Sequence, residues 1–265
     1  MNDIVLNADL RHAPWLDPNA WRLPGVQPLD PNDWLLVDDA YAGQMRLKDD
    51  LIATRESEVH TILPDARPAA EECLDLVLKT LAEFDGFDVQ ADQVTRPDGH
   101  RVAVERTRPL LTLGRLIQED VCLMMPGRSG EHVLAGAILC FPASWTLAEK
   151  IGKPLVRIHK PVPAYDDNIA RRVQRLFDGI RPERPLWRAN ALLYDHPYLF
   201  SPRREAGGPR HLSEDGRFLR SERQTLRKLP DTGAVVFTIH TTVLPIEDLS
   251  EAQRDALHLV ARASG

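Results

Sequence analysis

The run PLVRIHKPVPAY, residues 154–165, places a single histidine, His159, among three prolines. Proline fixes φ and removes a backbone donor, so we expect this run to be neither ordinary helix nor central strand. A stiff backbone would hold the imidazole in one direction. The ring is then either a hydrogen-bonded core side chain or a ligand, and the spacing leaves both interpretations open.

A ligand role for His159 has a specific chemistry, because an imidazole is a common protein ligand of haem iron. Haem also needs an apolar slot. The apolar runs that contain Leu123, Met124, Leu139 and Phe141 could line such a slot.

Basic and aromatic residues near the histidine are further candidate cofactor contacts. Arg157 and Lys160 flank His159 and could pair with haem propionates, although solvated basic side chains are the alternative. Tyr165 ends the run, and Arg223 lies in the run SERQTLRKLP, where a surface position is the simpler interpretation.

The composition is that of an ordinary globular chain. It has 265 residues, enough for one large domain or two small ones, with 43% apolar and 27% charged residues. The net charge is −6 and the 33 Lys and Arg are dispersed, which does not favour nucleic-acid or polybasic membrane binding. The polar N-terminus lacks a signal-peptide layout, and no apolar run is long enough to span a membrane.

The three cysteines, Cys73, Cys122 and Cys140, are far apart and have apolar neighbours. This pattern is typical of reduced core residues in a cytoplasmic protein. The sequence also lacks GxGxxG, GxxxxGK[ST] and HExxH, so the common phosphate-binding loops and zinc-protease motif are absent.

The hydrophobic pattern predicts an α+β fold. Residues 1–45, rich in Pro, Asp and Trp, suggest an extended arm, and 67–84 a helix with one apolar stripe. Strand-like runs with turns between them cluster from 86 onward, which favours an antiparallel sheet over a doubly wound one. The elements expected after residue 85 are a hairpin turning at 97–99, strands at 116–125, 133–141, 186–195, 218–230 and 234–245, and helices at 146–151, 166–180 and 250–264.

Several ordered runs together resemble a known family. The chain resembles the haem-dependent oxidative N-demethylase alpha-subunit-like family, which includes the haem subunit of dimethylamine monooxygenase, from about residue 14 to 258. The runs that carry this resemblance are LIQEDVCLM, GAILCFPASWTLAEKIGKPL, IHKPVPAY, RLFDGIRPERPLWRAN, ERQTLRKLPDTGAVVFTI and PIEDL.

The resemblance implies a PAS-like antiparallel sheet with flanking helices that binds haem b, with N- and C-terminal extensions. We expect an N-terminal arm and helix, 1–85, to pack on a PAS-like haem-binding domain with a C-terminal helix, 86–265, as one structural unit. The family pattern IHxPVP falls on residues 158–163, which makes His159 the expected axial ligand and iron contact. Two positions depart from the pattern: Ala164 stands where glycine is usual, and His240 lies where an arginine and an aromatic residue are typical.

The implied activity is oxidation of a small N-methylated amine with O2, releasing formaldehyde, with electrons from a separate flavin and iron–sulfur reductase. Such an amine is cationic near neutral pH, so a carboxylate or an aromatic face should meet it. Asp120, Glu119 and Trp145 are the candidates, with a charged strand start and core packing as the simpler interpretations. A haem-binding sensor or gas-binding module, and a small-molecule-binding protein without haem, are the alternative functions.

Overall fold

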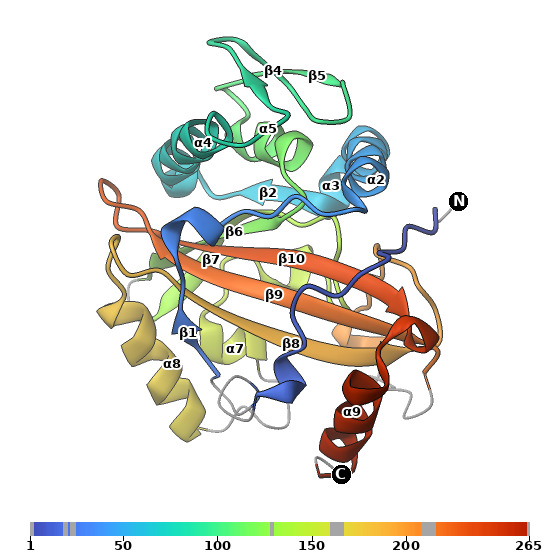
Figure 1. The fold of residues 1–265 in the computed structure, drawn as a ribbon. Coiled ribbons are helices and arrows are strands. Elements are labelled where there is room, and N and C mark those ends of the chain that lie inside the picture. The colour runs from blue at the N-terminus through green and yellow to red at the C-terminus, as the bar shows by residue number, and fades with distance from the viewer. Residues whose placement is uncertain are drawn as a thin grey trace.

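A seven-stranded antiparallel sheet forms the centre of the protein. The computed structural model describes residues 3–17, 21, 25–127, 130–159, 167–207 and 216–263. The strand order in this sheet is β1-β8-β9-β10-β6-β7-β2, and a separate three-stranded sheet has the order β3-β4-β5. Helices cover both faces of the large sheet (Figure 1). This mixed architecture agrees with the expected α+β class.

The long strands lie in the second half of the chain, where the sequence predicted them. The large sheet contains β1 (Gln27–Pro28), β2 (His60–Ile62), β6 (Asp120–Pro126), β7 (His132–Ile138), β8 (Leu186–Tyr194), β9 (Phe218–Lys228) and β10 (Val235–Pro245). The small sheet contains β3 (Asp88–Val89), β4 (Gln93–Thr95) and β5 (Arg101–Ala103). The α-helices are α2 (Tyr41–Thr54), α3 (Glu56–Val59), α4 (Arg67–Leu81), α5 (Pro109–Leu116), α6 (Leu147–Lys150), α7 (Leu155–His159), α8 (Asp167–Gly179) and α9 (Glu251–Ala263).

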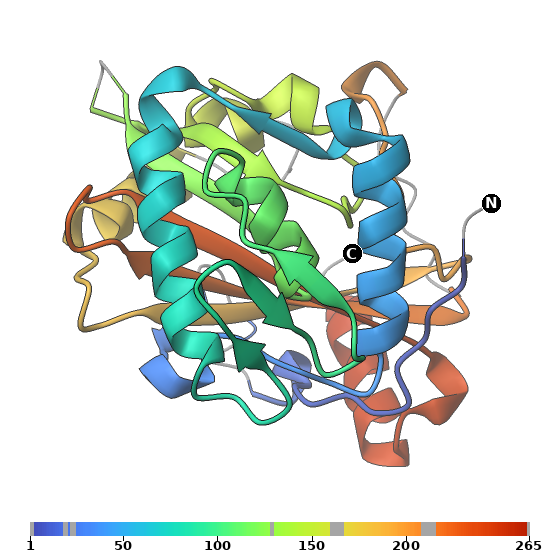
Figure 2. The same ribbon diagram turned by 90° about the horizontal axis from the view of Figure 1, so that it is seen from above.

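The upper face of the large sheet, in the orientation of Figure 1, carries α2, α4 and α5. Figure 2 shows this layer from above, with α2 and α4 on either side of α5 and the small sheet. Leu74 of α4, Leu113 of α5 and Ile52 of α2 share one buried cluster with Val121 and Val236 of the sheet. We call this cluster the upper core.

The lower face carries α6, α7 and α8 (Figure 1). Because successive side chains of a strand point to opposite faces, Val235 and Ile239 of β10 face down while Val236 faces up. The cluster on this side, which we call the lower core, consists of Cys122, Met124, Leu134, Ala137, Leu139, Leu147, Leu155, Phe177, Ile180, Leu226, Val235 and Ile239.

Local sequence signals account for several elements. The helix expected at 67–84 is α4, which has Pro68 in its first turn, where the missing N–H costs no hydrogen bond. The last helix begins with a capping box, since Ser250 N donates to Gln253 Oε1 and Gln253 N donates to Ser250 Oγ. The hairpin at 97–99 joins β4 to β5, with Gly99 at φ +80°.

Two expectations about the backbone were wrong. The proline-rich run was expected to contain no helix, yet Leu155–His159 form α7, because Pro154 precedes the helix and leaves its hydrogen bonds intact. The sequence interpretation also ended the extended arm at 45, whereas α2 begins at Tyr41. Gln44 and Lys48 of α2 are polar but buried, so the buried side of this helix does not appear as a continuous apolar stripe in the sequence.

Candidate functional site

His159 lies at the last residue of α7, below the large sheet. Leu155 belongs to the lower core and Ile158 packs against it, so the apolar side of α7 faces the sheet. The side chain of His159, and all of Lys160 and Tyr165, lie outside the described residues. Their cofactor roles therefore stay predictions.

A row of polar side chains lies on the same lower face, on β8 and β9. Arg188 is paired in register with Gln224, and Asn190 with Glu222. Arg188 Nη1 donates to Gln224 Oε1 at 2.7 Å, and Asn190 Nδ2 donates to Glu222 Oε2 at 3.3 Å. Leu226 continues this side of β9 into the lower core, so the row borders an apolar surface.

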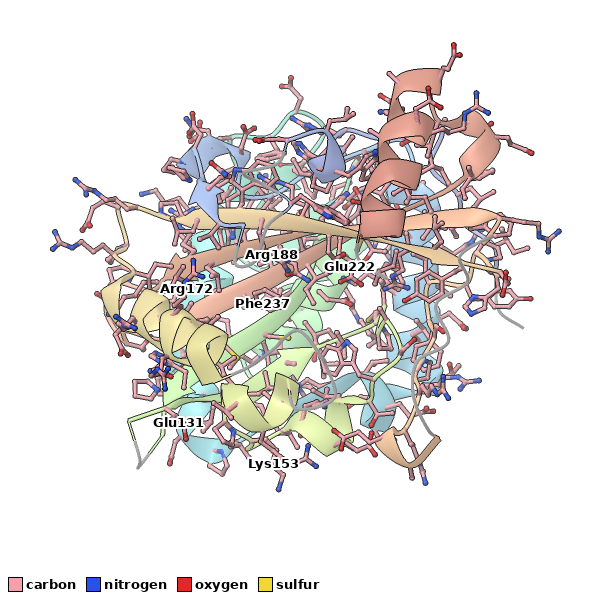
Figure 3. All side chains as sticks on the ribbon, turned by 90° about the horizontal axis from the view of Figure 1, so that it is seen from below. Glu131, Lys153, Arg172, Arg188, Glu222 and Phe237 are labelled. Carbon is pink, nitrogen blue, oxygen red and sulfur yellow. The ribbon has the colours of Figure 1, made fainter. Side chains whose placement is uncertain are left out.

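Phe237 of β10 connects the polar row to the lower core. Its neighbours on the same face, Val235 and Ile239, are buried, but Phe237 is only partly buried although it lies in the middle of the sheet. Figure 3, seen from below, shows Arg188, Glu222 and Phe237 on neighbouring strands beside α8. We call Arg188, Asn190, Glu222, Gln224 and Phe237 the lower-face site.

Two buried polar atoms at this site lack a hydrogen-bond partner among the described residues. They are Asn190 Oδ1 and Thr241 Oγ1. Thr241 is the register partner of Glu222, so it shares the same face. Buried polar groups are normally hydrogen-bonded, and each exception calls for an explanation such as a bound ligand or water.

Arg157 and Trp145 are on the same side of the molecule as α7, but only Trp145 reaches the lower core. Arg157 is on the surface, where Nη2 lies 3.0 Å from Glu205 Oε2. The Glu205 carboxylate also accepts a hydrogen bond from Lys150 at 2.6 Å, and these two cations lower the pKa of Glu205 to about 2. The guanidinium of Arg157 therefore faces a carboxylate rather than the sheet.

Arg223 and Phe141 lie elsewhere. Arg223 is on the upper side of β9, where it donates to the carbonyls of Asp33 and Trp34. Phe141 belongs to the upper core and is 2% exposed. The structure thus separates these two candidates from α7, and their proposed cofactor contacts stay predictions.

Asp120 belongs to a closed charge pair. Lys48 Nζ lies 3.3 Å from Asp120 Oδ1, and both side chains are fully buried. The amides of Cys140 and Phe141 donate to the two Asp120 oxygens, at 2.9 and 2.7 Å. Burial raises the pKa of Asp120, and the opposing effect of Lys48 and the two amides does not cancel it. These contacts already compensate the carboxylate, which leaves its substrate role a prediction.

Glu119 takes part in a second buried network, on the upper side of the sheet. His240 Nδ1 lies 3.1 Å from Glu119 Oε1, and His240 Nε2 lies 2.9 Å from Asp38 Oδ2. Leu36 N donates to the same Glu119 oxygen. Burial would lower the pKa of His240, but the hydrogen bonds and charges of Asp38 and Glu119 outweigh it and raise the pKa to about 9. His240 is therefore an imidazolium that ties the N-terminal arm to the sheet.

This network predicts a pH-dependent stability. The pKa of His240 is about 9 in the folded protein against 6.5 when unfolded, so the stabilisation is complete below about pH 6.5 and is lost as the pH rises through 9. We expect a loss of about 2 kcal/mol between pH 6.5 and 8. Urea unfolding from pH 6 to 8, below the range in which the cysteines of the unfolded chain ionise, measures it. His240→Gln should abolish the dependence, whereas His100→Gln at the β4–β5 turn should retain it; an unchanged slope in His240→Gln would contradict the assignment.

The sequence interpretation passed over most of the polar row. It did not single out Arg188, Asn190, Glu222 or Gln224 as site residues. The available signal was strand alternation, since Arg188 and Asn190, like Glu222 and Gln224, are two residues apart and so share a face. Lys48 also had a signal: it stands three residues after Met45 and four before Ile52, on the apolar stripe of α2.

A comparison with known families decides the relationship. The family described as haem-dependent oxidative N-demethylase, alpha subunit-like, matches residues 25–263. The chain belongs to this family. The resemblance carried by the sequence runs is thereby confirmed, and the description of the family indicates dependence on haem.

Among the described residues, no group of three or more His, Cys, Asp or Glu is arranged to hold a metal ion. Haem iron does not require such a cluster, since one axial protein ligand is sufficient. In the same part of the chain, no helix has both the length and the apolar character needed to cross a membrane.

Proposed function

We propose that the protein binds haem b below the large sheet, with His159 as the axial ligand, and oxidises a small N-methylated amine with release of formaldehyde. The observation that carries this proposal is the position of α7. Its last residue is His159, and its apolar side packs into the lower core beside a partly open aromatic ring, Phe237.

The described residues fit a haem in three respects. The lower core and Phe237 offer an apolar surface for the macrocycle. Arg188 offers a cation on the same face, which is the group that propionates require. The unpartnered Asn190 Oδ1 and Thr241 Oγ1 offer polar contacts at the boundary. Ligand sites commonly combine an apolar lining with a few placed polar groups in this way.

The protein residues bind and orient, while a bound haem supplies the oxygen and one-electron chemistry. Glu222 is the carboxylate of the lower-face site, and Phe237 is its aromatic ring. Together they can receive an alkylammonium group through charge and through the ring face. Glu222 Oε1 also lies 3.2 Å from Arg220 Nε, so an amine would share this carboxylate with a buried guanidinium. We propose Glu222 and Phe237 as the amine contacts in preference to Asp120 and Glu119 because they lie on the lower face, the side on which α7 ends.

The finer family features belong to the same proposal. We propose that the large sheet with α6, α7 and α8 is the PAS-like haem-binding unit, and that residues 1–85 pack on it. One cluster, the upper core, includes Trp34 and Leu74 as well as Val236, which supports packing of the two parts on each other. A separate reductase with flavin and iron–sulfur groups would supply the electrons.

Haem titration tests the proposal directly. We expect purified protein to bind haemin at one equivalent per chain with a Soret shift, and small methylated amines such as dimethylamine to perturb that spectrum. With an artificial electron donor and O2, formaldehyde should accumulate from the methylated amine and not from ammonia. If wild-type protein gives no Soret shift, the haem proposal is wrong; haem binding without formaldehyde would instead favour a sensor.

Replacing Glu222 tests the amine contact. We expect Glu222→Gln to weaken the spectral binding of dimethylamine by about 10- to 100-fold, because a hydrogen bond to a charged group is worth about 1.5–3 kcal/mol. Glu247→Gln, which removes a carboxylate from the 3-10 helix Ile246–Asp248, is the matched control. Haem affinity should be equal in both variants. Equal amine affinity in the two variants would contradict the role of Glu222.

A further inference from the structure

A groove runs between α8 and the start of β8. It has a volume of about 670 Å³. Its walls carry Arg172, Arg175, Arg181 and Arg184. Its apolar lining comes from Leu176, Ile180 and Leu186, of which Ile180 is buried and the two leucines are half-buried. Figure 3 shows Arg172 on α8 at the edge of the lower side of the sheet.

The four groove arginines are exposed, and none forms an ion pair with a carboxylate in the described part of the chain. The nearest acidic residues in the sequence do not line the groove: Asp178 accepts a hydrogen bond from Gln174, and Glu183 lies outside the lining. Several exposed arginines elsewhere are paired, as Arg67 with Glu71, Arg106 with Asp75, Arg108 with Glu56 and Arg157 with Glu205, whereas others, such as Arg46 and Arg101, form no ion pair among the described residues. The groove differs in bringing four such arginines together.

The positive charge of the groove is opposite in sign to the net charge of the whole protein. The chain has a net charge of −6, so it repels an acidic partner over most of its surface. Four uncompensated guanidinium groups in one groove attract such a partner to a single place and orient it there. Arginine beside apolar side chains is also the composition enriched in protein interfaces.

The shape of the groove favours a protein surface over a small anion. The helical part of the lining, from residue 172 to 179, extends over about 10 Å, at 1.5 Å per residue. Arg172 and Arg175 lie three residues apart on α8, and Arg181 and Arg184 lie opposite each other in the turn that follows the helix. The four charges are therefore distributed over this length, beside Leu176, Ile180 and Leu186. A single phosphate would meet one or two of these arginines, whereas a row of carboxylates with apolar neighbours can meet them all.

We propose that this groove docks an acidic patch of the protein that supplies electrons to the lower-face site. The assignment rests on the proposed function, because it names the partner that a haem-dependent oxygenase needs. Phe177 of α8 packs in the lower core, while Arg172 and Arg175 of the same helix line the groove. Ile180 and Leu186 line the groove and also contribute to the lower core or pack against it. Leu186 precedes Arg188 by two residues on β8, about 7 Å along the strand, so a partner in the groove lies beside the lower-face site.

A binding experiment tests the groove without haem. The probe is a plant-type ferredoxin, an acidic iron–sulfur protein, titrated into ¹⁵N-labelled protein at low salt. We expect amide shifts at Leu176, Ile180 and Leu186 that disappear in 0.5 M salt. A quadruple variant, Arg172→Gln, Arg175→Gln, Arg181→Gln and Arg184→Gln, should bind at least about tenfold more weakly, since these charges steer and hold the partner.

The control variant changes the net charge by the same amount elsewhere. Arg46→Gln, Arg67→Gln, Arg101→Gln and Arg106→Gln remove four exposed arginines outside the groove. This variant should bind ferredoxin like the wild type. The docking site would be overturned if both variants bound ferredoxin equally weakly, or if both bound it like the wild type. A second outcome would also overturn it. If inorganic pyrophosphate binds tightly in the groove and ferredoxin causes no amide shifts, the groove is a site for a small polyanion.

A second measurement links the groove to electron supply. In haem-reconstituted protein, the groove variant should be reduced more slowly by reduced ferredoxin but at the wild-type rate by dithionite, which needs no docking. Both variants should bind haemin equally. A wild-type protein that binds no haemin contradicts the proposed function, whereas wild-type haem binding with equal ferredoxin rates in all variants contradicts only the docking site.

Discussion

His159→Ala is expected to abolish stable haem binding while the protein stays folded. Loss of an outer partner of a metal ligand already costs about 10- to 100-fold in affinity, and loss of the axial ligand itself should cost more. His159 is the last residue of α7, so its truncation interrupts no turn of that helix. Haemin titration, followed at the Soret band, measures the effect.

The control for this variant is His100→Ala. His100 is exposed at the β4–β5 turn, in the small sheet above the upper core, and should leave haemin affinity unchanged. Adding imidazole to His159→Gly should restore a six- or five-coordinate spectrum by replacing the missing ring. If His159→Ala binds haemin with wild-type affinity and spectrum, the ligand assignment is wrong. The thermal unfolding curve of each variant checks that the fold is intact.

Lys48→Met is expected to lower the free energy of unfolding by about 3–5 kcal/mol at pH 8. Lys48 Nζ donates to the carbonyls of Ile117, Gln118 and Glu119 and neutralises Asp120, all without contact with water. Methionine fills much of the volume but leaves a buried carboxylate unpaired. Urea unfolding by circular dichroism gives the loss.

The pH dependence of this loss separates charge from packing. Burial already raises the pKa of Asp120, and removing Lys48 removes the main opposing effect. Protonation of Asp120 at lower pH relieves the penalty, so the deficit at pH 5 should be smaller than at pH 8. Asp120→Asn added to Lys48→Met should recover part of the stability at pH 8.

The matched control is Arg67→Met, which breaks an exposed pair with Glu71 at 3.0 Å. Exposed helical pairs are worth about 0.3–0.5 kcal/mol, so this variant should unfold almost like the wild type. A Lys48→Met loss no larger than that of Arg67→Met would show that the buried pair does not stabilise the fold.

The sheet and most helices were predictable because their signals are local. β9 and β10 follow from β-prone runs joined at a Asp-Thr-Gly turn, and α4 and α9 follow from apolar spacing with a first-turn proline or a capping box. The position of His159 at the end of a short helix was missed, because the prolines around it were taken to exclude helix, although Pro154 precedes the helix and is compatible with its start.

The grouping of polar residues depended on strand register, which the sequence does not state. Glu119 and Asp120 are adjacent, yet they join different networks, because one pairs with His240 and the other with Lys48. Arg188 and Glu222 are far apart in the sequence and meet only through the β8–β9 pairing. The family pattern identified His159, but the register of the sheet was needed to find the face beside it.

The three cysteines divide between the two cores: Cys73 and Cys140 are in the upper core and Cys122 is in the lower core. Burial raises the pKa of all three thiols, to about 12 for Cys73, so none reacts with alkylating reagents while its core is closed. Labelling kinetics resolved by peptide mass would therefore time the opening of each side of the sheet separately. A ligand that binds below the sheet should slow the labelling of Cys122 before it slows that of the other two.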